Sequence, residues 1–398
     1  MPLSLQQGLD TLLVVAVVAA VAPLVSGLTP WVRLPQVVVL IVGGVLVGPQ
    51  LLGWAEPASI ELLSNLGLGF LFLLAGYELE LHLFRERPGQ LAFVGWATTV
   101  AVAILVTGLL EAVGFVRDFV PIALGLTTTA LGTLLPILRD AGVLTGRLAP
   151  YILSAGAVGE FLPVLGIAIL LSAHGRLLGL LSLAAVGVAA VVLTVAPKLF
   201  RAERLRRVFW EGEHATSQTT LRCTVLLLLI LLVIASDFGL DVVLGAFLAG
   251  VVLRRWAPGN VQLLENKLDA LGYGFFIPIF FVSSGMTLDL DSIIEAPTRL
   301  VVFFLLLLAV RGMPALVVYR GELDVTQRVQ MTLLTATALP LLVALSQIGL
   351  STQTMLPENA AALVGAGVLS VMVFPGVALA LNRRAAVSEP DQSVSHIP

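Results

Sequence analysis

Charged residues are scarce in this sequence of 398 residues. Asp, Glu, Lys and Arg together make up 12% of it, about half the share that soluble domains carry. Hydrophobic residues make up 58%, and the mean hydropathy is +1.02. Many apolar runs reach about 20 residues, the length that crosses a hydrocarbon layer of about 30 Å. These features exclude a soluble fold and predict an all-α protein that spans a membrane many times.

Residues that build cofactor and catalytic sites are also few. Cys223 is the one cysteine, which excludes a disulfide framework within the chain. The longest polar stretch, residues 201–218, is too short to fold alone, so no nucleotide-binding domain is expected. The four histidines are scattered along the sequence: His82, His174, His214 and His396. We therefore expect no enzyme, no cofactor, no resident metal and no nucleic-acid partner.

Hydropathy predicts about thirteen membrane spans. Under this prediction the first apolar run is a retained helix, because it lacks the basic flank and cleavage pattern of a signal peptide. The residues after 383 are expected to form a disordered tail. The predicted spans are 9–28, 34–52, 62–83, 89–113, 118–138, 149–172, 177–197, 219–236, 239–254, 269–287, 299–319, 327–349 and 360–382.

The distribution of Lys and Arg predicts the orientation of these spans. If the N-terminus lies outside, 18 of the 22 Lys and Arg residues fall on one side of the membrane. Cytoplasmic loops carry such an excess of positive charge. We therefore expect a multi-pass protein of the inner (plasma) membrane, surrounded by lipid, with its N-terminus outside and its C-terminus in the cytoplasm.

Two short segments of the sequence look alike. They are Leu126-Thr-Thr-Thr-Ala-Leu131 in the fifth span and Leu334-Thr-Ala-Thr-Ala-Leu339 in the twelfth. Thr hydroxyls compete for backbone groups, and Pro136 or Pro340 follows each segment, so each helix is predicted to unwind there. The two spans run in opposite directions, which indicates an inverted-topology repeat with two discontinuous helices, as in many secondary transporters. The predicted broken-helix site comprises Thr127, Thr335 and Thr337.

Two ionisable side chains lie deep within predicted spans, where a charge costs at least about 2.5–3.5 kcal/mol. They are Glu160 in the sixth span and Arg311 in the eleventh. A carboxylate can bind either a proton or a hard cation such as Na⁺ or K⁺, with oxygens of Thr128 and Thr129 as further ligands. Arg311 stays charged, so we expect it to stabilise the broken helix ends or to neutralise Glu160. A buried pair of these two residues kept for structure alone is the alternative.

Two further acids, Glu78 and Glu80, end the third predicted span near Arg85 and Arg87. They are candidates for a cytoplasmic funnel that collects cations. The alternative is that they form interfacial salt bridges with the neighbouring arginines.

With these motifs in place, the sequence resembles the bacterial monovalent cation/proton antiporters, in the branch with thirteen-span sodium/proton and Kef-type potassium/proton exchangers. Four stretches carry the resemblance: Arg33 to Pro49 with Gly44-Val-Leu-Val-Gly48, Gly67 to Leu81 with Ala-Gly76-Tyr-Glu78-Leu-Glu80, Gly239 to Leu253 with Leu244-Gly245 and Gly250, and Pro278 to Asp289 with Ser-Gly285-Met-Thr-Leu.

The resemblance implies a homodimer in which a mobile core moves against a dimerising scaffold. It also implies that the discontinuous fifth and twelfth helices cross. The implied parts are scaffold helices 1–88, core helices 89–175, a linker helix and loop 176–218, scaffold helices 219–296, core helices 297–382 and the tail 383–398.

The sequence departs from the family pattern at the expected ion site. The family carries two adjacent acids, or Asn-Asp, in the sixth span, and this chain has Gly159-Glu160. Glu160 matches the ion-binding acid, Gly159 leaves the other position empty, and Arg311 takes the place of the family's basic residue. A single carboxylate predicts electroneutral exchange of one cation for one proton. A sodium-coupled solute symporter of similar fold and a non-transporting membrane sensor or scaffold remain the alternatives.

Overall fold

The computed structural model describes residues 5–28, 35–78, 85–140, 142–143, 146–171, 184, 187–188, 218–237, 242–256, 261–295 and 297–388. Within these ranges the chain is helical and contains no β-strand. The predicted linker helix 177–197, most of the loop that follows it and the end of the tail fall almost entirely outside the described residues.

The first half of the chain contains α1 (Leu5–Leu28), α2 (Gln36–Val47), a short 3-10 turn (Pro57–Ile60), α3 (Glu61–Glu78), α4 (Arg87–Ala112), α5 (Phe119–Gly125), α6 (Leu131–Asp140) and α7 (Ala149–Leu170). The second half contains α10 (Thr219–Asp237), α11 (Val242–Trp256), α12 (Val261–Leu271), a π turn (Gly272–Phe276), α13 (Ile277–Met286), α14 (Leu290–Glu295), α15 (Pro297–Leu306), a second π turn (Leu307–Gly312), α16 (Pro314–Val318), α17 (Val325–Thr335), α18 (Pro340–Ser351) and α19 (Pro357–Ser388).

Nine helical segments in the described ranges are long and apolar enough to cross a membrane. They correspond to nine of the predicted spans. The second predicted span contains the shorter apolar helix α2, the fifth is divided between α5 and α6, and the ninth covers most of the 15-residue helix α11. The multi-span prediction is therefore confirmed, and the count of thirteen stays a prediction.

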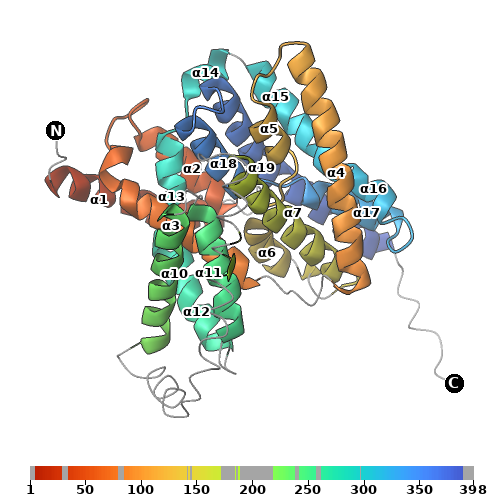
Figure 1. Cartoon of the computed structure of the whole chain (residues 1–398), viewed down its shortest axis with the longest axis horizontal. Helices are drawn as coiled ribbons and strands as arrows, with labels where there is room; N and C mark the ends of the chain where they lie inside the picture. Colours follow the sequence, from red (N-terminus) through yellow and green to blue (C-terminus); the bar gives the residue numbers. More distant parts are fainter. Residues whose placement is uncertain are drawn as a thin grey trace.

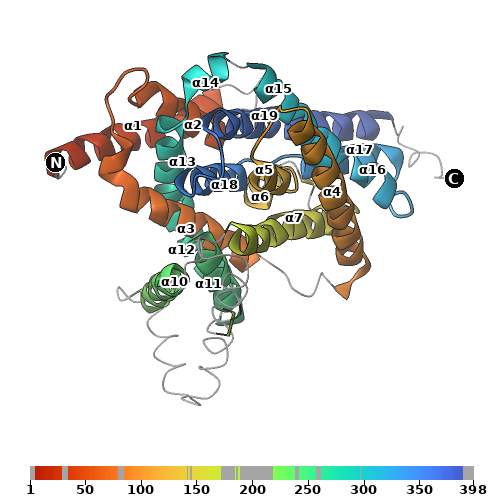
Figure 2. The ribbon, with the colours of Figure 1, turned by 45° about the horizontal axis from the view of Figure 1, so that its top comes forward.

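The helices form two groups that lie side by side (Figures 1 and 2). Group one contains α1–α3 and α10–α13, where α3 packs against α11 and α2 against α13. Group two contains α4–α7 and α15–α19, where α4 packs against α7 and α19 against α15, α17 and α18. One apolar cluster joins the groups, because it includes residues of α3 and α11 together with residues of α7 and α18.

Two close helix crossings hold group one together, and both depend on glycine. A Cβ on Gly44 of α2 or on Gly285 of α13 would overlap a backbone carbonyl of the other helix. Gly76 of α3 and Gly250 of α11 have the same relation to each other. Only glycine lets two backbones approach so closely. These four glycines lie in the stretches that carry the family resemblance.

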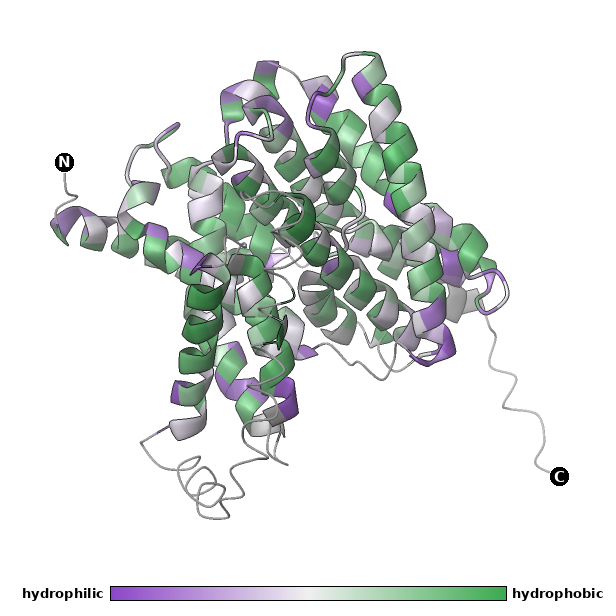
Figure 3. Cartoon of the chain, viewed as in Figure 1, coloured by the Kyte–Doolittle hydropathy of each residue, from purple (hydrophilic) through white to green (hydrophobic). Residues whose placement is uncertain are grey.

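Hydrophobic residues occupy long stretches of the helices (Figure 3). On α1 the exposed large side chains recur about every four residues, along one face: Leu5, Leu9, Leu13, Val17, Val21 and Leu24. On a soluble protein such a stripe would be unstable in water, whereas lipid tails are a suitable solvent for it. The surface therefore agrees with a helix bundle embedded in a membrane.

Candidate functional site

The first break in a helix lies between α5 and α6, at residues 126–130. The Thr127 hydroxyl donates to Leu124 O at 2.7 Å and the Thr128 hydroxyl to Gly125 O at 2.8 Å. Each hydroxyl is a second donor to a carbonyl that also accepts the N–H of the same threonine, so both threonines are bonded to the last turn of α5. The unwinding therefore occurs at the Thr cluster itself, and the backbone of α6 continues past Pro136.

The second break lies between α17 and α18, at residues 336–339. The hydroxyl of Thr335 donates to Met331 O at 2.7 Å, and that of Thr337 donates to Leu333 O at 3.1 Å. Pro340 is the first residue of α18, a position where the missing N–H of proline costs nothing. The hydroxyl of Ser370 on α19 bonds to both N–H and C=O of Ala338 at 3.0 Å.

The two breaks are bonded to each other and to α7 through three contacts. The N–H of Ala130 donates to Thr337 O at 2.8 Å, and the Thr129 hydroxyl donates to Thr335 O at 2.7 Å. The N–H of Thr129 also donates to Gly159 O of α7 at 2.9 Å. Polar backbone groups freed by the two breaks thus satisfy each other, as they must in a medium without water.

Arg311 is hydrogen-bonded to this junction from a third segment of the chain. It lies in the second π turn, an irregularity that often marks functional sites, and is 4% exposed. Its Nε donates to Thr129 Oγ1 at 2.9 Å and its Nη2 to Ala155 O of α7 at 3.1 Å. In the described part of the chain no carboxylate lies within ion-pair distance of this guanidinium. The guanidinium is thus bonded to the first break and to α7, and it forms no ion pair with Glu160.

Glu160 lies on α7 beside the start of α6. Its side chain is 5% exposed and accepts hydrogen bonds from the backbone N–H groups of Leu131 and Gly132. These are the first two residues of α6, so the carboxylate faces the positive end of a helix. Glu78 is the last residue of α3, a helix that contacts α6. Glu80 lies outside the described residues.

The space that a side chain at Gly159 would occupy is taken by Arg311 and Thr129. A Cβ on this glycine would lie 2.5 Å from Arg311 Nη2 and 2.8 Å from Thr129 Oγ1. The absence of a side chain therefore lets the guanidinium cross the backbone of α7 and reach Ala155 O.

The chain matches a known protein family over most of its length. Residues 16–381 match the family described as sodium/hydrogen exchanger, transmembrane. The chain belongs to this family. The family consists of secondary transporters, which confirms the resemblance seen in the sequence and the expectation that the chain is not an enzyme.

Two members of the family with curated descriptions are longer than this chain. YjbQ of Bacillus subtilis (strain 168), provisionally named a Na⁺/H⁺ antiporter, is 27% identical over 97% of this chain and 65% of its own length. Cation/H⁺ antiporter 18 of Arabidopsis thaliana is 29% identical over 73% of this chain and 38% of its own length. The chain thus spans less than two thirds of the length of either relative.

A solved structure shows the same fold. The sodium proton antiporter MjNhaP1 from Methanocaldococcus jannaschii, at pH 8, superimposes with a TM-score of 0.62 and 16% identity. The match covers 96% of this chain and 97% of that one. The likeness confirms an all-helical exchanger fold.

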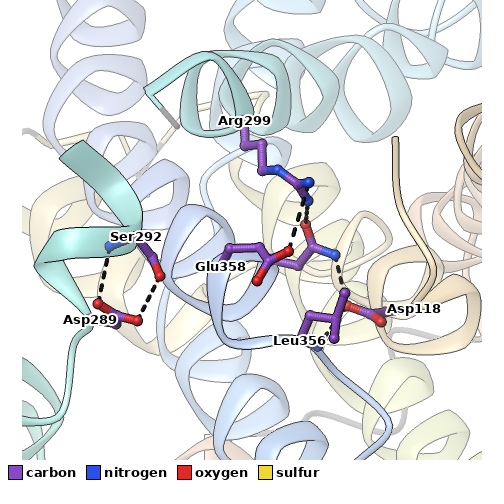
Figure 4. A network of polar contacts seen from close by, with 7 residues as sticks. Asp118, Asp289, Ser292, Arg299, Leu356 and Glu358 are labelled. Carbon is purple, nitrogen blue, oxygen red and sulfur yellow. Dashed lines mark hydrogen bonds and ion pairs between the residues drawn. The ribbon is translucent and has the colours of Figure 1, made fainter. Parts of the chain in front are cut away.

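A polar cluster that no sequence motif had indicated lies at one end of group two (Figure 4). Asp118 Oδ2 accepts from the N–H of Leu356 and from Asn359 Nδ2, both at 2.8 Å. Arg299 donates to Asn359 Oδ1 and lies 3.8 Å from Glu358. The cluster connects the loop before α5, the first turn of α15 and the first turn of α19.

A matching cluster lies at the opposite end of the 26-residue helix α4. Arg87 Nε donates to Glu322 Oε1 at 3.1 Å, and the Tyr151 hydroxyl donates to Glu322 Oε2 at 3.2 Å. These residues come from the first turn of α4, the loop before α17 and the first turn of α7. Each cluster thus joins the first turn of one helix, the loop before a broken helix and the first turn of another helix, with residues from both halves of the chain.

Proposed function

We propose that this protein exchanges a monovalent cation, Na⁺ or K⁺, for a proton across the cytoplasmic membrane. The observation that carries the proposal is the buried Glu160 carboxylate at the junction of two broken helices, without a cationic side chain to neutralise it among the described residues. A carboxylate in this setting needs a positive partner, and a proton or a hard cation can fill that need in turn. The names of its relatives, Na⁺/H⁺ and cation/H⁺ antiporters, support the same function.

Oxygen atoms beside Glu160 are suited to complete a cation site. The carbonyls of Thr127, Thr128 and Thr129 accept no hydrogen bond from the described part of the chain. Hard monovalent cations prefer such neutral oxygens together with one carboxylate. We propose that Glu160 binds the cation with oxygens of Thr128 and Thr129, and that Thr127, Thr335 and Thr337 keep the two breaks open.

Arg311 has a supporting part in this proposal. It is bonded to Thr129 and to the α7 backbone, so it fixes the distance between the first break and Glu160. Its charge does not change during the cycle. Since Glu160 alone exchanges charge partners, one cation replaces one proton, and the exchange is electroneutral.

The finer architecture belongs to the same proposal. We propose thirteen spans with the N-terminus outside, in which the broken helices α5–α6 and α17–α18 cross. Group one, from 1–88 and 219–296, forms the scaffold of a homodimer. Group two, from 89–175 and 297–382, forms the moving core, and 176–218 links them. Glu78 and Glu80 form the cytoplasmic entrance, and the contact between α6 and α3, which ends at Glu78, supports the access of Glu78 to Glu160.

The test uses everted membrane vesicles with a pH-sensitive dye, challenged with Na⁺, K⁺ and Li⁺. Glu160→Gln keeps the shape of the side chain and should abolish cation-dependent proton movement. Glu111→Gln, an exposed acid at the end of α4, is the matched control and should transport normally. Normal exchange by Glu160→Gln would remove this residue from the mechanism.

Electroneutrality is tested in proteoliposomes that contain the purified protein, with Na⁺ as the exchanged ion and the membrane potential set by K⁺ and valinomycin. A cycle that moves net charge would shift its equilibrium point by about 2.3 kcal/mol per charge for each 100 mV. We expect the equilibrium point to stay the same at every membrane potential. A shift would require a second proton site.

A further inference from the structure

A small cavity lies in the seam between the two helix groups. Its volume is about 60 Å³, room for a few water molecules. On the side of group one it is lined by Ser284, Thr287 and Asp289, at the end of α13. On the side of group two it is lined by Ser346 and Gln347 of α18. The cavity therefore contains an acid, an amide and three hydroxyls among its apolar walls.

Ser346 is the distinctive residue of this cavity. Its side chain is 3% exposed, and its hydroxyl has no hydrogen-bond partner in the described part of the chain. Other hydroxyls nearby bond to the preceding turn of their own helix, such as Ser284 to Phe280 O at 2.7 Å and Ser351 to Ile348 O at 2.9 Å. A buried hydroxyl without a partner is costly. Ser346 therefore has bonding capacity that a group within the cavity can use.

Asp289 supplies a negative charge to the same cavity. Its carboxylate accepts from the Ser292 hydroxyl at 2.6 Å and from the Ser292 N–H at 3.1 Å (Figure 4). These bonds lower the pKa of Asp289 below its ordinary value, so the group stays ionised near neutral pH. In the described residues its partner is a serine and not a cationic side chain.

The repeat relates this cavity to the proposed cytoplasmic entrance. Gly76 of α3 and Gly285 of α13 occupy equivalent places in the two close helix crossings. Two residues after these glycines stand Glu78 and Thr287, and four residues after them stand Glu80 and Asp289. Thr287 therefore corresponds to Glu78, and Asp289 corresponds to Glu80. Inverted repeats place equivalent residues on opposite sides of a membrane. The cavity is then the outer counterpart of the entrance formed by Glu78 and Glu80.

We propose that this cavity is an outer cation subsite, in which a monovalent cation binds the Asp289 carboxylate, the Ser346 hydroxyl and the amide oxygen of Gln347 before it passes to Glu160 or after it leaves. The inference rests on the proposed exchange function. A cation bound there would satisfy the Ser346 hydroxyl and the charge of Asp289 together. Because the cavity lies between the two groups, movement of one group against the other would open a path for the cation.

The experiment measures the half-saturating Na⁺ concentration at each face of the membrane, in right-side-out and in everted vesicles. Asp289→Asn should raise the outer value by about tenfold, as expected for the loss of one charged contact, and Ser346→Ala should raise it by a smaller factor. The inner value should stay unchanged in both variants. Ser292→Ala, which weakens the turn but keeps the carboxylate, and Asp291→Asn, a neighbouring acid outside the cavity lining, are the controls and should match the wild type.

Three outcomes would overturn the inference. Equal outer values for Asp289→Asn and the wild type would exclude Asp289 as a ligand. An equal rise in Ser292→Ala and Asp289→Asn would assign the carboxylate to capping α14 alone. A rise of the inner and outer values together would indicate general damage. Failure of the proposed function itself is distinguishable, because the wild-type protein would then show no cation-dependent proton movement at either face.

Discussion

Gly159→Ala is the sharpest probe of the junction, because the structure gives the atoms that the new methyl group would meet. These are Arg311 Nη2 at 2.5 Å, Thr129 Oγ1 at 2.8 Å and Thr129 Cβ at 2.9 Å. Arg311 can swing away only by losing its bond to Ala155 O. Thr129 cannot move without breaking its bonds to Thr335 O and to the α7 backbone.

The expected magnitude follows from these contacts. Overpacking costs about 1–3 kcal/mol, and the lost bond of a charged donor costs about 1.5–3 kcal/mol. Replacing glycine by alanine within a helix stabilises the helix by about 1 kcal/mol. We expect Gly159→Ala to destabilise the protein by about 3 kcal/mol and to reduce transport with it, because Thr129 belongs to the proposed cation site.

The assay is thermal unfolding of the purified protein in detergent, with Gly376→Ala as the control. Gly376 lies within α19, and a methyl group added to it would meet no atom within 4 Å, so alanine there should be neutral or slightly stabilising. In a background of Arg311→Ala, the cost of Gly159→Ala should fall by about 1–2 kcal/mol because the closest clash is gone. A Gly159→Ala protein as stable as the wild type would refute this account of the junction.

Three other predictions concern charged residues of group two. Arg311→Ala should lower the melting temperature in detergent. Arg311→Lys should retain measurable exchange, because lysine keeps the charge and a nitrogen that donates hydrogen bonds. Unchanged melting of the alanine variant would contradict this. Asp118→Ala should cost about 2–4 kcal/mol by leaving two buried donors unsatisfied, and a denaturation midpoint equal to that of the wild type would disprove it. Arg87 lowers the pKa of Glu322 from its ordinary 4.5, so the Glu322 contribution is present above pH 4.5 and is lost as the pH falls through the lowered pKa. Melting curves between pH 3 and 6 should therefore be less pH-dependent for Glu322→Gln, and equal slopes would rule the interaction out.

The two polar clusters of group two extend this picture. One is buried, since Asp118 is 7% exposed and Asn359 is fully covered, and the other is open to solvent at Arg87. Added salt should therefore weaken the interactions of the Arg87–Glu322 cluster more than those of the Asp118–Asn359 cluster. Both clusters join helices of the two halves of the chain, which supports the proposal that group two moves as a single body.

The sequence by itself determined the class of fold and the main elements of the site. Lipid demands apolar stretches of a certain length and makes each buried charge expensive, so composition alone reveals the spans, and Glu160 and Arg311 stand out within them. The Thr clusters likewise marked both breaks, because hydroxyls beside an unwound turn are a local signal. The position of Pro136 was a weaker signal, since α6 runs past it.

Only the tertiary structure decided which groups these residues contact. Arg311 and Thr129 are 182 residues apart, and Arg311 and Ala155 are 156 apart, so no local pattern could select these partners over Glu160. The filled position beside Gly159 and the Asp118–Asn359 contact depend in the same way on helices that meet through packing. Local preferences and the solvent act on neighbours in sequence, whereas the choice of a hydrogen-bond partner depends on backbone positions that the whole bundle fixes.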